Sequence, residues 1–162
     1  MDLDALYREH SERLLRYLLR LSGNIEVAED LLQETFMKAL ERPPQTNDHP
    51  RAWLFTVATN LMRDHARRRG RRDQLLLERH PRPYPGPTPL ESAERAELRE
   101  RLYVALGSLN ERERIATVMR EEGFTHREIA EAIGTTTGTI GTLLARALQK
   151  LSKQLPFDGE AT

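Results

Sequence analysis

The sequence predicts an all-α protein of two small helical domains joined by a proline-rich linker. Apolar residues recur at helical spacing along most of the chain, and no segment alternates like a strand. Proline recurs with a glycine at 81–89, which excludes regular structure there. After this segment, residues typical of a helix start are repeatedly followed by residues typical of a helix end. We therefore expect a three-helix domain at 1–75, a linker at 76–90 and a four-helix domain at 91–162.

The amino-acid composition excludes several classes of function and site. The 162 residues include no cysteine, which excludes disulfides and thiolate metal sites. No run approaches the roughly 18 apolar residues of a membrane span, and the acidic N-terminus lacks a signal-peptide core. The five histidines are scattered and no phosphate-binding glycine loop appears. These observations predict a cytoplasmic protein without membrane insertion that is not an enzyme and has neither metal nor cofactor.

The net charge of zero hides a strong asymmetry. Residues 1–50 carry six basic and ten acidic side chains, whereas residues 51–72 carry seven basic and one acidic. The positive charge is therefore concentrated in one short stretch, which favours nucleic acid as a partner.

Two helices are expected before that stretch. The first spans Leu3–Leu21, with Gly23 as its C-terminal cap, and the second runs from the cap Asn24 to about Glu41. Paired prolines keep the following loop, 42–49, out of helix. The expected buried positions are Leu6, Leu14, Leu18, Leu21, Ala28, Leu31, Leu32, Thr35 and Ala39.

The basic stretch 51–72 predicts an amphipathic helix. At 100° per residue an apolar face forms opposite a polar face, and the last turns are almost purely cationic. The polar face carries Thr56, Asn60, Arg63 and Arg67. The apolar face carries Leu54, Val57, Ala58, Leu61 and His65.

Four short helices are expected after the linker. Capping boxes beginning at Thr88, Asn110 and Thr125 predict three helix starts, and Thr135 or Thr136 caps the last helix. Residues 125–144, THREIAEAIGTTTGTIGTLL, match a helix-turn-helix, with Ala130 at the helix crossing and Gly134 in the turn. In such a motif the N-terminal end of the second helix enters the DNA major groove.

Both halves together resemble bacterial RNA polymerase sigma factors of the extracytoplasmic-function (ECF) class. The segments that carry the resemblance are AEDLLQETFMKAL (28–40), HPRAWLFTVATNLMRDHARRR (49–69) and LNERERI (109–115), followed by the helix-turn-helix. The resemblance implies a promoter-specificity subunit that binds core RNA polymerase, recognises and melts promoter DNA, and is regulated by an anti-sigma factor.

The resemblance also implies site residues. Asp30, Gln33, Glu34 and Phe36 fall on the family's polymerase-binding positions. The positions that meet the minus-ten element are Gln45, Thr46, Asn47, Asp48, Asn60, Arg63, Arg67 and Arg68. The positions that meet the minus-thirty-five element are Arg112, Arg127, Thr136, Thr137, Thr139, Thr142 and Arg146.

The second helix of the motif departs from the family pattern. Gly141 and Leu143 stand where the family customarily has cations. Because each lost phosphate contact weakens binding, we expect weak or unusual minus-thirty-five recognition. Leu143 and Leu148 are expected to face a protein partner instead. Two alternatives stay open: a sigma-like decoy that binds an anti-sigma factor, and a helix-turn-helix regulator that works without polymerase.

Overall fold

The computed structural model describes residues 2–44, 48–76 and 92–155, and every regular element in them is a helix. The N-terminal helices are α1 (Leu3–Ser22), α2 (Ile25–Glu41) and α3 (Pro50–Leu76). The C-terminal helices are α4 (Ala93–Gly107), α5 (Glu111–Glu121), α6 (His126–Ile133) and α7 (Thr137–Gln154). The predicted all-α class is thus confirmed for the described residues.

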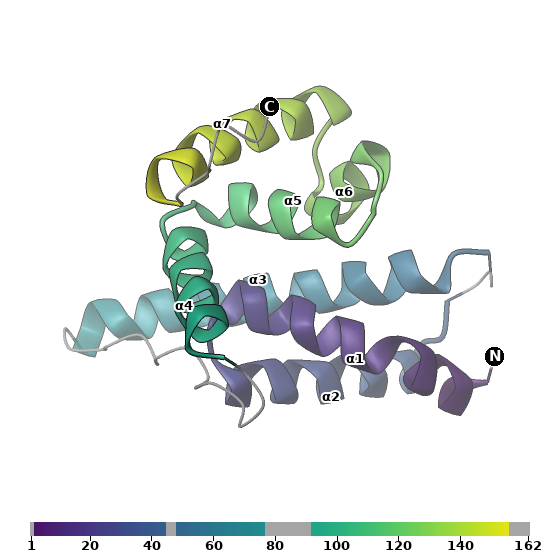
Figure 1. Cartoon of the computed structure of the whole chain (residues 1–162). Helices are drawn as coiled ribbons and strands as arrows, with labels where there is room; N and C mark the ends of the chain where they lie inside the picture. The colour runs from purple at the N-terminus through teal and green to yellow at the C-terminus, as the bar shows by residue number, and fades with distance from the viewer. Residues whose placement is uncertain (1, 45–47, 77–91, 156–162) are drawn as a thin grey trace.

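The first three helices pack around one core (Figure 1). Asn24 caps α2 by accepting from the backbone N–H groups of Glu26 and Val27, and Gly23 ends α1 at φ +66°. Leu14, Tyr17 and Leu18 of α1 are fully buried, as are Leu54 and Phe55 of α3. Burying each such side chain stabilises the fold by about 1.5–3 kcal/mol.

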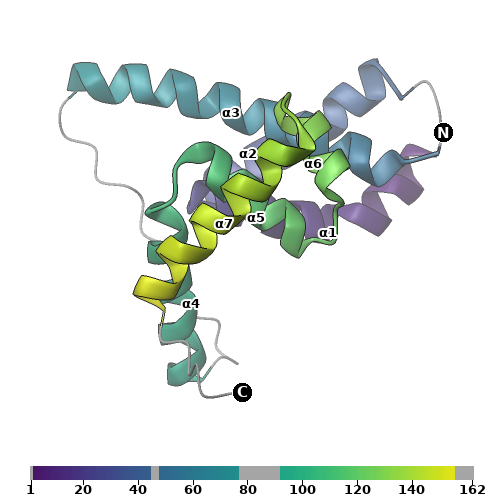
Figure 2. The same ribbon diagram turned by 90° about the horizontal axis from the view of Figure 1, so that it is seen from above.

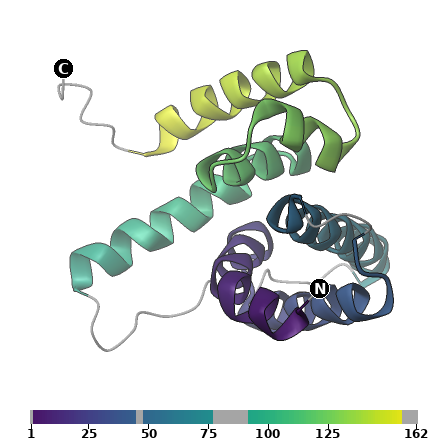
Figure 3. The same ribbon diagram turned by 90° about the vertical axis from the view of Figure 1, so that its right-hand side faces the viewer.

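The long helix α3 organises the molecule. Its N-terminal half packs on α1 and α2, whereas its C-terminal end extends beyond the other helices (Figure 2). Seen from the side, the N-terminal helices form one group and the C-terminal helices lie beside it (Figure 3). Helix α6 packs on α3, and α5 packs on α1. The two halves of the chain are therefore in direct contact.

The helix-turn-helix is present as predicted. Gly134 ends α6 at φ +82°, where a residue with a Cβ is strained, and Thr136 caps α7. Ile129, Ile133 and Ile140 fill the core shared by the two helices.

Two details of the C-terminal half correct the sequence interpretation. Helix α4 begins at Ala93 with Ser92 as its cap, so the predicted start at Thr88, which lies outside the described residues, was wrong. Leu143 is only 5% exposed and belongs to the core, so it cannot face a partner, whereas Leu148 is 61% exposed. The physical reason is that Leu143 lies one turn after Ile140 on the same buried face of α7.

Candidate nucleic-acid and polymerase interfaces

Helix α2 presents a mixed polar and apolar outer face. Asp30, Gln33 and Glu34 are exposed, whereas Phe36 is 7% exposed and meets Tyr7 edge-on at 4.9 Å between ring centroids. Phe36 therefore contributes to the wall of a groove and does not project from the surface.

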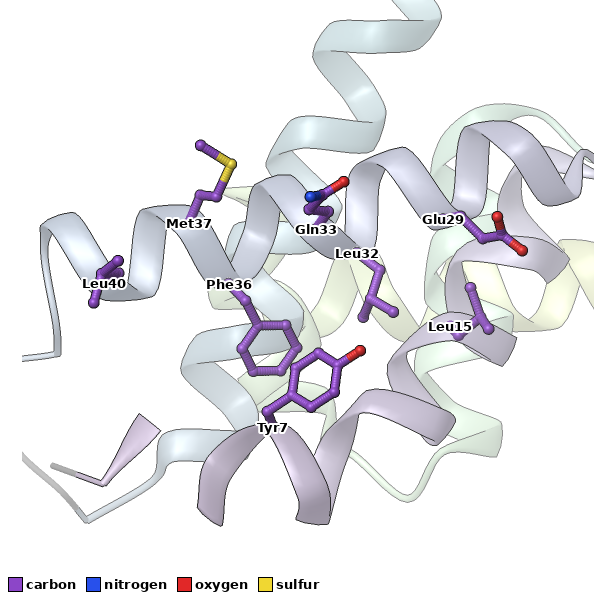
Figure 4. Close-up of a pocket in the computed structure, with 8 residues that line it drawn as sticks. All are labelled: Tyr7, Leu15, Glu29, Leu32, Gln33, Phe36, Met37 and Leu40. Carbon is purple, nitrogen blue, oxygen red and sulfur yellow. The ribbon is translucent and has the colours of Figure 1, made fainter. Parts of the chain in front are cut away.

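The groove lies between α1 and α2 (Figure 4) and has a volume of about 600 Å³. Two of its residues, Met37 and Leu40, are 54% and 70% exposed. Large apolar side chains exposed beside carboxylates are typical of a protein-binding surface. The groove is lined by Tyr7, Leu15, Glu29, Leu32, Gln33, Phe36, Met37 and Leu40.

The predicted minus-ten residues of α3 differ in accessibility. Asn60 is exposed, and so are Arg67 and Arg68. Arg67 forms a loose pair with Asp64 of its own helix at 3.6 Å, which leaves its guanidinium accessible. Before α3, Asp48 is exposed in the chain, while Gln45, Thr46 and Asn47 lie outside the described residues.

Arg63 is the exception on α3, because the C-terminal helices hold it. Its side chain is 18% exposed, and its Nε donates to Oε1 of Glu111 at 2.6 Å. Its Nη1 donates to the carbonyl of Ile133, the last residue of α6, at 3.0 Å. A cation at a helix C-terminus also interacts favourably with the helix dipole.

A second cross-domain contact lies at the N-terminal end of α3. Arg51 donates to the backbone carbonyl of Glu122, and its guanidinium lies 4.2 Å from the ring centroid of Phe124. The Glu122 carboxylate lies 3.7 Å from Arg51 and 3.8 Å from Arg20 of α1. We call the Arg63 and Arg51 contacts together the interdomain contact.

Buried aromatic rings also pack against one another across the boundary between the N-terminal and C-terminal helices. Phe55 of α3 lies 4.9 Å from Tyr17 of α1 and 5.0 Å from Phe124 of the C-terminal half, measured between ring centroids. The Tyr17 hydroxyl also shares a 2.6 Å hydrogen bond with Thr59, and burial raises the pKa of Tyr17. Tyr17 is therefore protonated at any physiological pH, and it fixes the position of α3 against α1.

The predicted minus-thirty-five residues surround the start of α7. Thr136 accepts from the backbone N–H of Thr139, and the two hydroxyls lie 3.0 Å apart. Thr137 and Thr142 are exposed, but Thr142 Oγ1 donates back to the Gly138 carbonyl at 3.3 Å. Thr137 is thus the threonine of this set whose side chain makes no hydrogen bond within the described residues.

The predicted cations of the C-terminal half separate into two groups. Arg127 is 85% exposed and pairs with Glu131 of its own helix at 3.5 Å. Arg112 and Arg146 line a cleft of about 450 Å³ together with Arg63 and Arg67 of α3. The structure therefore places cations expected to bind separate promoter elements beside one another.

Sequence reasoning missed the partners of Arg51 and Arg63, which are Glu111, Glu122, Phe124 and the Ile133 carbonyl. The hydrogen-bonded partners lie 48 to 71 residues away along the chain, and Phe124 lies two residues beyond Glu122. No periodicity within one helix signals a contact of this kind.

Comparisons with known proteins identify the class. Residues 6–72 match the family model for sigma-70 region 2, and residues 99–151 match the model for sigma-70 region 4. The chain is thus built from two sigma-70 regions, and it belongs to the ECF class of RNA polymerase sigma factors, the subunits that confer promoter specificity.

Curated relatives support this class. The chain is 34% identical over 152 residues to ECF RNA polymerase sigma factor SigL of Mycobacterium tuberculosis, covering 91% of this chain and 85% of that one. It is 39% identical over 159 residues to SigE of Mycolicibacterium smegmatis, covering 94% of this chain but 61% of that longer protein.

Two solved structures share the fold of this chain. The sigma factor RpoE of Bartonella quintana, in complex with the anti-sigma factor NepR, matches with a TM-score of 0.83 at 27% identity. That match covers 97% of this chain and 98% of RpoE. CnrH, in complex with the cytosolic domain of CnrY, matches with a TM-score of 0.69 at 26% identity, over 97% of this chain and 89% of CnrH.

Two kinds of feature are absent from the described residues. No helix among them is long and apolar enough to cross a bilayer. No group of three or more histidine, aspartate or glutamate side chains among them is arranged to hold a metal ion.

Proposed function

We propose that this chain binds core RNA polymerase through α2, opens the minus-ten region with α3 and the loop before it, and contacts upstream DNA with α7. One observation carries the proposal: two sigma-70 region matches fall on helices on which several of the predicted working residues face solvent. These include Gln33 on α2, Asn60 on α3 and Thr137 on α7.

The division of labour follows from the chemistry of each face. Acidic and apolar side chains on α2 suit a basic protein surface with apolar pockets. An exposed amide and arginines on α3 suit a single strand and its phosphates. The chain contributes no catalytic group of its own in this proposal, because nucleotide addition belongs to the polymerase. Such a subunit works in the cytoplasm.

Reconstituted transcription tests the proposal. Core polymerase from the same organism is mixed with the chain and a library of genomic fragments, and the 5′ ends of the transcripts are sequenced. Sigma activity yields transcripts that share a common upstream sequence and require the chain. Gel filtration tests the alternative of a helix-turn-helix regulator that works without polymerase, since such a regulator does not co-elute with core polymerase.

An anti-sigma factor is the second partner we propose. RpoE, which this chain resembles over almost its whole length, was solved with an anti-sigma factor bound. This chain also leaves Leu148 of α7 and Val104 of α4 exposed at 61% and 65%. A pull-down with Leu148→Asp as the variant tests whether Leu148 takes part.

A further inference from the structure

A cleft of about 450 Å³ lies between α3 of the N-terminal half and α5 and α7 of the C-terminal half. Arginine side chains line it from all three helices, two from α3, one from α5 and one from α7. Its volume falls within the range of small-molecule sites, which is about 300–1,000 Å³. The polar residues that line it are Arg63, Arg67, Asn110, Glu111, Arg112 and Arg146.

The charges in this cleft do not balance. Glu111 is the one carboxylate among the lining residues, and Arg63 already binds it at 2.6 Å. Arg67 has only a loose pair within α3, at 3.6 Å. Arg112 and Arg146 are exposed, and neither side chain makes a hydrogen bond or ion pair with any described residue. Because like charges gathered in one cleft repel each other, a bound anion would relieve a cost that the free chain bears.

The N-terminal end of α5 adds neutral donors to the same cleft. Asn110 caps α5 by accepting from the backbone N–H of Glu113 through Oδ1, so the described residues leave its amide N–H groups unused. The backbone N–H groups of Glu111 and Arg112 also lack a partner among the described residues, as is usual in the first turn of a helix. Such N–H groups and the helix dipole favour a phosphate at a helix N-terminus.

The spacing of the cations on three helices indicates an extended anion. An arginine binds a phosphate through two parallel N–H···O bonds, and a single phosphate has few positions for such a pair of bonds. A chain of two or three phosphoryl groups offers a separate position to each guanidinium. Its several negative charges also match the three arginines that Glu111 does not neutralise.

We propose that this cleft is a binding site for an oligophosphate, either free or as the phosphate chain of a nucleoside triphosphate. Arg67, Arg112 and Arg146 bind the phosphoryl oxygens, and the start of α5 donates the neutral hydrogen bonds. The site goes beyond the proposed function, because it concerns a small ligand of the chain and requires neither promoter DNA nor polymerase.

Isothermal titration calorimetry of the full-length chain tests the ligand class at about 0.15 M salt, the physiological ionic strength. Sodium tripolyphosphate is expected to bind about tenfold or more tightly than orthophosphate, because it engages more than one guanidinium. Equal Kd values for the two anions, or no saturable binding of tripolyphosphate below about 1 mM, would overturn the proposal.

Adenosine triphosphate distinguishes the two sources of the phosphate chain in the same titration. A lower Kd than that of tripolyphosphate assigns the site to a nucleoside triphosphate. An equal or higher Kd assigns it to a free oligophosphate, because the nucleoside then adds no favourable contact.

Matched pairs of substitutions separate a built site from attraction by overall charge. Arg112→Gln with Arg146→Gln is expected to raise the Kd for tripolyphosphate about tenfold or more. Arg13→Gln with Arg95→Gln removes the same charge from exposed positions that do not line the cleft. This control pair is expected to change the Kd by less than about twofold, since salt screens distant exposed charges. Similar losses in both pairs would overturn the site.

Two neighbouring arginines of α3 test whether the N-terminal half contributes. Arg67 lines the cleft, whereas Arg68, which is also exposed, does not. Arg67→Gln is expected to raise the Kd for tripolyphosphate by about threefold to fivefold, and Arg68→Gln is expected to leave it unchanged. Equal effects of the two substitutions would show that α3 supplies only general charge and would overturn a site shared by three helices.

The side-chain amide signal of Asn110 locates the bound anion in heteronuclear NMR spectra. Tripolyphosphate is expected to shift this signal in the wild type and to leave it in place in the Arg112→Gln with Arg146→Gln variant at the same concentration. Saturable binding without a shift in the wild type would place the anion elsewhere and contradict the assignment. Since none of these measurements uses core polymerase or a promoter, the oligophosphate site and the proposed function can fail separately.

Discussion

Lys150 of α7 lies 2.6 Å from the carboxylate of Glu113, a residue of α5 that is only 1% exposed. Glu113 is also the third residue of a capping box, in which its side chain accepts from the backbone N–H of Asn110 at 3.0 Å. One buried carboxylate therefore fixes the start of α5 and joins it to α7.

Removing the cation should destabilise the C-terminal domain. Lys150→Met leaves a buried carboxylate with one partner fewer, which costs about 1–3 kcal/mol of unfolding free energy because burial penalises an unpaired charge. Urea unfolding followed by circular dichroism measures the loss. Lys153→Met, three residues further along α7, is the control; equal unfolding curves for the two variants would contradict the structural role of the pair.

The same carboxylate should make stability depend on pH. Burial by itself would raise the pKa of Glu113, but hydrogen bonds from Lys150 and from the Asn110 backbone outweigh it and hold the pKa below its ordinary 4.5. The resulting stabilisation is present above pH 4.5 and is lost as the pH falls through the pKa of the folded state. The stability difference between wild type and Glu113→Gln should therefore shrink as the pH falls below 4.5 in urea titrations. A constant difference would argue against this assignment.

Replacing each of two glycines by alanine should change the stability of the chain in opposite directions. Gly141 lies inside α7, and a Cβ added there would meet no atom within 4 Å, so Gly141→Ala should stabilise the chain by about 0.5–1 kcal/mol. Gly134 lies at φ +82°, so Gly134→Ala should destabilise it by about 1 kcal/mol. Thermal unfolding of both variants checks the signs, and a shared sign would refute the comparison.

Changes on α3 should impair promoter opening more than changes on α7. Arg63→Ala with Arg67→Ala removes two proposed phosphate contacts, so the salt slope of DNA binding should fall by about 2. Thr137→Ala with Thr142→Ala removes no charge. Permanganate reactivity of promoter thymines, measured with core polymerase present, ranks the two pairs. The reverse ranking would mean that α7 supplies most of the productive contact.

Reversing charge on α2 should weaken polymerase binding without changing the fold. Asp30→Lys with Glu34→Lys replaces two exposed carboxylates that we propose face a basic partner, and should raise the Kd for core polymerase by about tenfold or more. Glu94→Lys with Glu97→Lys on exposed positions of α4 makes the same change in charge elsewhere. Fluorescence anisotropy with labelled chain gives the Kd values. Similar losses in both pairs would point to a nonspecific charge effect.

Local signals predicted the helices better than the contacts between them. Asn24, Asn110, Thr125 and Thr136 all cap the helices expected of them, because a cap depends on residues within one turn. Helix α4 is different: Thr88 and Ser92 are both capable caps in a polar segment, and the structure uses Ser92.

The interdomain contact could not be predicted from local pattern. Arg63 lies on the polar face of α3, where periodicity indicates solvent, yet another domain covers it. Leu143 shows the converse: its departure from the family pattern suggested a partner, and the core of its own domain explains it. In both cases tertiary packing decided what the sequence left open.

The 18% exposure of the Arg63 side chain has a kinetic consequence. A diffusing DNA phosphate can reach the Nε of this guanidinium only after the pair with Glu111 has broken. Association is then a two-step process in which a first-order opening precedes encounter. The observed rate constant should level off at high DNA concentration, at the frequency with which the molecule opens by itself.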